Sequence, residues 1–115
     1  MALDISLIEI FENITSRAAL ASYHFVGKKD KTAADKAAVD VMRNLLNNLD
    51  IQGKIVIGEG ELDEAPMLYI GEKLGINIDD NNTPALDIAV DPLECTKNCA
   101  NNLPNAMTVM AIAPR

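Results

Sequence analysis

Aromatic side chains are scarce in this chain. It contains no tryptophan, and aromatic residues make up 3% of its 115 residues, whereas hydrophobic residues make up 49%. A core must therefore be built mainly from Ala, Leu, Ile, Val and Met. Such a core favours helices packed on a sheet over an aromatic-rich β-sandwich. The length is enough for one small domain.

Histidine and cysteine are also rare. Cys95 and Cys99 are the only cysteines, and His24 is the only histidine. Two cysteines four residues apart do not make a disulfide framework. They could share one helix face, but His24 lies far away in the sequence, which argues against a zinc site.

Positive charge and long apolar runs are lacking as well. The formal net charge is -7, which argues against nucleic acid as a partner, because a phosphate backbone needs a basic surface. No apolar run reaches membrane-spanning length, and the first residues lack the basic-then-apolar pattern of a signal peptide. We therefore expect a cytosolic protein with no membrane partner.

Hydrophobic periodicity predicts a mixed α/β architecture. The first helix has an apolar stripe of Leu7, Phe11, Ile14, Ala18, Ala21 and Phe25, and the second has Ala34, Ala38, Val41, Leu45 and Leu49. Thr32 is the expected N-cap of the second helix, with Asp35 in its first turn. A third helix is expected from Pro66 to Gly75, since Met67, Ile70 and Leu74 give it an apolar side. Strands are expected at residues 54–57, 85–90 and 106–112, and residues 77–84 read as a surface loop.

Acidic residues follow two of these strands. Glu59 and Glu61 come after residues 54–57, and Asp91 and Glu94 come after residues 85–90. If the two strands are neighbours, Glu59 and Asp91 converge at one edge of the sheet. Carboxylates gathered in one pocket need a cation to ionise together, and Mg²⁺ or Mn²⁺ prefers their oxygen ligands. Each acidic group alone also fits a solvated turn, and Asp35 alone fits a capping acid.

The dipeptide Asp91-Pro92 predicts a helix start directly after the second strand. Pro92 suits the first helical position, and the following amides, up to Thr96, would then be free to bind an anion such as phosphate. The Thr96 hydroxyl could hold a water. Carboxylates for metal beside amides for phosphate are what metal-assisted phosphate hydrolysis requires.

Three motifs resemble those of class II, GlpX-type fructose-1,6-bisphosphatases. They are residues 55–72, residues 87–94 followed by Thr96, and Asp30-Lys31 with Ala34-Asp35. They stand in the family's order, and the block around Glu59 is the most specific. The resemblance implies the layered αβαβα fold of inositol monophosphatase-like enzymes, with a mixed sheet flanked by helices. It also implies removal of the 1-phosphate of fructose 1,6-bisphosphate to give fructose 6-phosphate, in gluconeogenesis.

The resemblance also assigns roles to residues. By motif position the metal ligands would be Asp35, Glu59, Asp91 and Glu94, holding Mn²⁺ or Mg²⁺, with the Leu93 carbonyl as a further ligand. Thr96 would orient the attacking water together with Asp35. The substrate phosphate would contact Glu94, Cys95 and Thr96, and Glu61 would line the site. A full-length form could be a homo-oligomer.

Departures from the family leave alternatives open. Family members have Gly where this chain has Cys95, their sequence differs over residues 97–104, and they are much longer. We therefore expect residues 1–115 to be an incomplete N-terminal part of the family's domain. One alternative is a truncated, non-catalytic remnant of such an enzyme. Another is a related phosphatase that acts on sedoheptulose bisphosphate or inositol phosphates.

Overall fold

The computed structural model describes residues 4–63, 65, 67–80 and 82–115. The elements in chain order are α1 (Ser6–Tyr23), α2 (Lys31–Asn47), β1 (Gln52–Ile57), β2 (Lys73–Leu74), β3 (Ala85–Glu94), α3 (Thr96–Ala100) and β4 (Met107–Pro114). The fold is mixed α/β, as the sequence predicts. In the described part of the chain, no helix combines the length and apolar character needed to cross a membrane.

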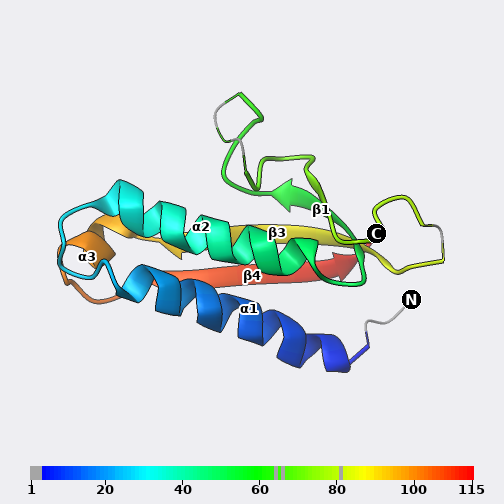
Figure 1. The fold of residues 1–115 in the computed structure, drawn as a ribbon, viewed down its shortest axis with the longest axis horizontal. Helices are drawn as coiled ribbons and strands as arrows, with labels where there is room; N and C mark the ends of the chain where they lie inside the picture. The colour runs from blue at the N-terminus through cyan, green and yellow to red at the C-terminus, as the bar shows by residue number, and fades with distance from the viewer. Residues whose placement is uncertain (1–3, 64, 66, 81) are drawn as a thin grey trace.

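The four strands form one mixed sheet in the order β2-β1-β3-β4. β1 and β3 are parallel neighbours, with Ile55 opposite Ile88. β2 pairs antiparallel with β1, and β4 pairs antiparallel with β3. α1 and α2 lie side by side over one face of the sheet (Figure 1). The ends of β1 and β3 therefore point the same way, toward the end of the molecule where α2 begins.

The core lies between the two long helices and the sheet. Its fully buried side chains include Ile14 of α1, Met42 of α2, Ile55 of β1 and Ile88 of β3. The predicted stripe of the first helix is confirmed at Phe11, Ile14 and Ala18. In α2 the buried face is Ala34, Ala38, Val39, Met42 and Leu46, so its second half lies one residue later than predicted.

The start of α2 differs from the prediction. Asp30, not Thr32, is the N-cap, and its side chain accepts a hydrogen bond from the Ala33 amide at 3.0 Å. Either residue type can cap a helix, and the one that caps is the one whose backbone leaves the helical conformation. Asp35 therefore lies on the second turn and takes no part in the cap.

The predicted helix from Pro66 to Gly75 is wrong over the described residues, and Pro66 itself lies outside them. Leu68, Gly71 and Gly75 have positive φ angles of 55°, 95° and 114°, which a right-handed helix does not allow. Leu74 instead pairs with Gly53 of β1. Tertiary pairing overrode the helical spacing of the apolar residues.

The expected helix start at Pro92 is also wrong. β3 continues through Glu94, and the register between Asp91 and Glu94 shifts, so that Asp91 lies opposite Val109 and Glu94 opposite Met107. Pro92 is buried in this bulge. A residue without an N–H is tolerated there because the regular ladder is interrupted.

Candidate metal centre

Three carboxylates from separate segments lie near enough for their charges to interact. Asp35 lies on α2, Glu59 lies two residues beyond β1, and Asp91 lies near the end of β3. After burial, the charges of Asp35 and Asp91 raise the pKa of Glu59, and the charge of Asp91 raises that of Asp35. The parallel pairing of β1 and β3 brings Glu59 to Asp91, and α2 adds Asp35. We call these three side chains the carboxylate cluster.

Burial and mutual repulsion make the cluster hard to ionise. Burial, reinforced by the charges of Asp35 and Asp91, raises the pKa of Glu59 from 4.5 to about 7. Burial is also the largest cause of the raised pKa of Asp35. The interaction between these two side chains lowers the pKa of Asp35 and raises that of Glu59, which favours a protonated Glu59 beside an ionised Asp35. A bound cation would therefore compete with the proton on Glu59.

The donor set fits a hard divalent cation, because every member offers carboxylate oxygens. The cluster is not a finished coordination sphere, however. Within residues 4–63, 65, 67–80 and 82–115, no group of three or more His, Cys, Asp or Glu side chains is close enough to hold a metal ion. Among the described residues, the cluster therefore has the donor type that a metal ion needs but not the geometry of a bound one.

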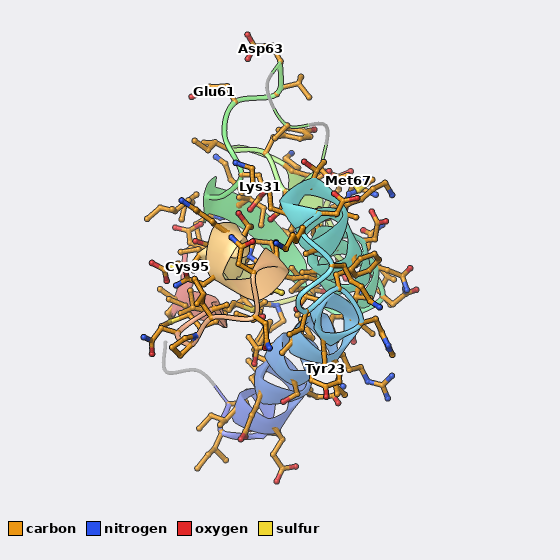
Figure 2. All side chains as sticks on the ribbon, turned by 90° about the vertical axis from the view of Figure 1, so that its left-hand side faces the viewer. Tyr23, Lys31, Glu61, Asp63, Met67 and Cys95 are labelled. Carbon is orange, nitrogen blue, oxygen red and sulfur yellow. The ribbon has the colours of Figure 1, made fainter. Side chains whose placement is uncertain are left out.

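Glu59 is held by the loop that follows β1. Its amide donates to the Leu68 carbonyl at 2.9 Å, which joins the two sides of the loop. A Cβ at Gly58 would lie 2.2 Å from that same carbonyl oxygen, so only glycine fits there. Glu61 is exposed further along this loop, which projects from the body with Glu61 and Asp63 near its tip (Figure 2).

The segment from Glu94 to Thr96 turns the chain from β3 into α3. Glu94 is exposed, and among the described carboxylates it is not one of those that shift the pKa of Asp35 or Glu59. Cys95 has a left-handed φ of 63° and Thr96 begins α3. Figure 2 looks onto this end of the molecule, where the labelled Lys31 and Cys95 both lie. The structure thus joins Asp35, Glu59 and Asp91, and places Glu94, Cys95 and Thr96 just beyond Asp91.

A left-handed backbone at residue 95 explains why glycine suits this position. Glycine adopts positive φ without steric cost, whereas a side chain there is strained. Cys95 is exposed and Cys99 is buried, both as free thiols. Cys99 lies against the Ser22 carbonyl, with its sulfur 3.7 Å from the oxygen.

Sequence reasoning assigned no role to Arg43 and Glu72. They form a part-buried ion pair beside the loop of Glu59, with Arg43 Nη2 donating to Glu72 Oε2 at 3.0 Å. Glu72 stands between Gly71 and Lys73, so its local sequence gives no signal of a buried acid.

Nearly the whole chain matches one protein family. The model of the family described as bacterial fructose-1,6-bisphosphatase, glpX-encoded, matches residues 6–115. The chain is 52% identical over 105 residues to "Fructose-1,6-bisphosphatase 1 class 2" of Escherichia coli (strain K12), covering 91% of this chain and 30% of the relative. It is 48% identical over 116 residues to "D-fructose 1,6-bisphosphatase class 2/sedoheptulose 1,7-bisphosphatase" of Thermosynechococcus vestitus, covering 94% and 33%. The chain thus spans about a third of the length of these curated relatives.

The fold resembles that of a longer protein of known structure. It is an extragenic suppressor from Pyrococcus furiosus, with a TM-score of 0.59 and 18% sequence identity. The match covers 94% of this chain and 40% of that one. The mixed sheet flanked by helices is therefore an arrangement already seen in a longer protein.

Proposed function

The chain belongs to the family of bacterial, glpX-encoded fructose-1,6-bisphosphatases, and from this premise we propose that the carboxylate cluster is the metal-binding part of a phosphatase site. The substrate is fructose 1,6-bisphosphate, from which the 1-phosphate is removed in gluconeogenesis. The oxygen of a water forms a bond to phosphorus, and the bond from phosphorus to the sugar O1 breaks. The sugar oxygen leaves with a proton, giving fructose 6-phosphate and inorganic phosphate.

One observation carries this proposal. Three half-buried carboxylates, Asp35, Glu59 and Asp91, come from separate segments, and burial followed by the charges of Asp35 and Asp91 raises the pKa of Glu59. Such groups are costly to ionise unless a cation lies between them. In our proposal Mn²⁺ or Mg²⁺ takes that place, with Glu94 as a fourth carboxylate ligand.

Ions held by these carboxylates would lower the pKa of the attacking water and neutralise negative charge on the phosphoryl oxygens. The protein's own residues do the rest. The hydroxyl of Thr96 and the carboxylate of Asp35 orient the water, and the turn from Glu94 to Thr96 contacts the phosphate. The proposed phosphate contact is supported by the position of this turn, which follows Asp91 closely along the chain.

Sedoheptulose 1,7-bisphosphate is a second candidate substrate. The relative from Thermosynechococcus vestitus is named for both bisphosphates. Both are sugar bisphosphates with a 1-phosphate, so the same carboxylate cluster would serve either. A cytoplasmic location and a homo-oligomer of a longer form stay predictions.

Titration of Mn²⁺ into the metal-free 115-residue chain, followed by calorimetry, tests the metal site. We expect saturable binding that is lost in Asp91→Asn, because this change removes a charge and a ligand oxygen while keeping the side-chain shape. We expect weak or no phosphate release from fructose 1,6-bisphosphate, since the chain spans only about a third of its relatives' length. Absence of Mn²⁺ binding, or binding that survives Asp91→Asn, would refute the proposed centre.

A further inference from the structure

An ion pair ties α2 to the loop that carries Glu59. Arg43 Nε and Nη2 donate to Glu72 Oε2 at 3.1 and 3.0 Å. The Glu72 side chain is only 6% exposed, and that of Arg43 is 37% exposed. The two residues are 29 positions apart in the sequence. The pair therefore fixes a long-range contact between the helix and the returning side of the loop.

Glu72 acts on the loop through the backbone of Leu68. Its second oxygen, Oε1, accepts the Leu68 amide at 2.8 Å. The Leu68 carbonyl in turn accepts the Glu59 amide at 2.9 Å. Only one residue, Leu68, thus lies between the ion pair and Glu59, and both of its backbone polar groups take part.

Leu68 needs such support to keep its conformation. Its φ is 55°, in the left-handed region that a leucine rarely adopts, and its side chain is completely buried. A strained backbone persists only when surrounding contacts determine it. The amide bond to Glu72 is one such contact, and the close approach of Gly58 to the Leu68 carbonyl is another.

The same helix also presents Asp35. Asp35, Val39 and Arg43 are spaced at i, i+4 and i+8 on α2, so they lie along one side of it. Val39 of this row is buried. A single rigid element thus carries Asp35 directly and holds Glu59 indirectly, through Arg43, Glu72 and Leu68.

We propose that Arg43 and Glu72 are positioning residues that set the place of Glu59 relative to Asp35 in the metal centre. Neither residue need contact the metal or the substrate. Their role is to hold the loop backbone so that the Glu59 carboxylate meets Asp35 and Asp91. The effect on metal binding rests on the proposed function, whereas the effect of the ion pair on the loop of Glu59 can be measured without any metal.

The experiment compares the full chain with its Glu72→Gln variant by amide hydrogen exchange and by Mn²⁺ titration. Glutamine keeps an acceptor for the Leu68 amide but loses the charge that holds Arg43. We expect faster exchange at the amides of Leu68 and Glu59, with no change in β3 and β4. We expect Mn²⁺ affinity per folded molecule to fall by about 10- to 100-fold, as for other changes just outside a ligand set.

Asp87→Asn is the matched control. It breaks the ion pair of Asp87 with Arg115, whose Nε lies 3.0 Å from Asp87 Oδ1 at the other end of β3. We expect wild-type exchange at Glu59 and wild-type Mn²⁺ affinity in this control. If the ion pair were purely structural, Glu72→Gln would lower the unfolding temperature but leave the Mn²⁺ affinity of the folded molecules unchanged.

Arg43→Lys is the second test of the ion pair and replaces Glu72→Gln if that variant does not fold. Lysine keeps the charge but not the two-pronged contact, so we expect a smaller change in the same direction at the Glu59 amide and in Mn²⁺ affinity. Unchanged exchange at Glu59 in the folded variants would overturn the positioning role. If the wild-type chain binds no Mn²⁺, the metal centre fails, and the exchange data still decide the positioning role separately.

Discussion

Replacing Glu59 by glutamine should stabilise the metal-free protein at alkaline pH. The pKa of Glu59 is raised from 4.5 to about 7, so the folded chain binds a proton that the unfolded chain has lost over this range. Stability therefore falls as pH rises from about 4.5 to about 7, and the loss is complete above that window. The full shift corresponds to at most about 3 kcal/mol. Because the side chain is only half buried, solvent screening reduces this to about 1–2 kcal/mol.

The assay is denaturant unfolding with a chelator present, at pH 5 and at pH 8. At pH 8 we expect Glu59→Gln to be more stable than the wild type by about 1–2 kcal/mol, and at pH 5 we expect most of that difference to disappear. Adding Mn²⁺ at pH 8 should reverse the order, because a ligand that binds only the folded state stabilises the chain that keeps its carboxylate. Equal stabilities at pH 8 would refute the claim that Glu59 is ionised at a cost.

Three further results are expected. Cys95→Gly should stabilise the chain by about 1 kcal/mol, seen as a higher unfolding temperature, because glycine relieves the left-handed φ of 63°. A lower unfolding temperature would contradict this. Gly58→Ala should destabilise the chain by about 1–3 kcal/mol and weaken Mn²⁺ binding, since its Cβ would meet the Leu68 carbonyl oxygen at 2.2 Å; wild-type behaviour in denaturant unfolding would show that the loop can move away. Removing Mn²⁺ with a chelator should lower the unfolding temperature of the wild type but not of Asp91→Asn, and an equal drop in both would place the ion elsewhere.

The two strands that matter for the site were predictable from local pattern. Short apolar runs at residues 54–57 and 85–90 reappear within β1 and β3, and the acids that follow them lie where parallel strands end. The partnership of Glu59 with Asp91 needed one further condition, that the strands be neighbours. The sequence could not show whether the strands are neighbours, and the sheet order places β1 beside β3.

Local pattern was wrong where long-range contacts outweighed it. Met67, Ile70 and Leu74 have helical spacing, yet Leu74 pairs with β1 and Leu68 takes a left-handed φ. The buried carboxylate of Glu72, held by Arg43 from another element, stabilises that conformation. No periodicity within the segment could reveal a partner 29 residues away.

Asp35 shows the same division for a single residue. In sequence it fits a capping acid as well as a ligand, and only family resemblance favoured the second interpretation. The structure gives the cap to Asp30, and burial followed by the charge of Asp91 raises the pKa of Asp35. Whether a carboxylate caps a helix or faces other acids depends on which backbone amides and which charges surround it.

By itself, the sequence determined the family, the mixed α/β class and the acidic residue types at the strand ends, because these depend on composition and on contacts between near neighbours. Only the tertiary structure decided that Asp35 of α2 lies near the acids at the two strand ends, that residue 95 has a left-handed backbone, and that an ion pair holds the loop of Glu59. These features depend on contacts between distant segments, whose energies arise only when the chain is packed.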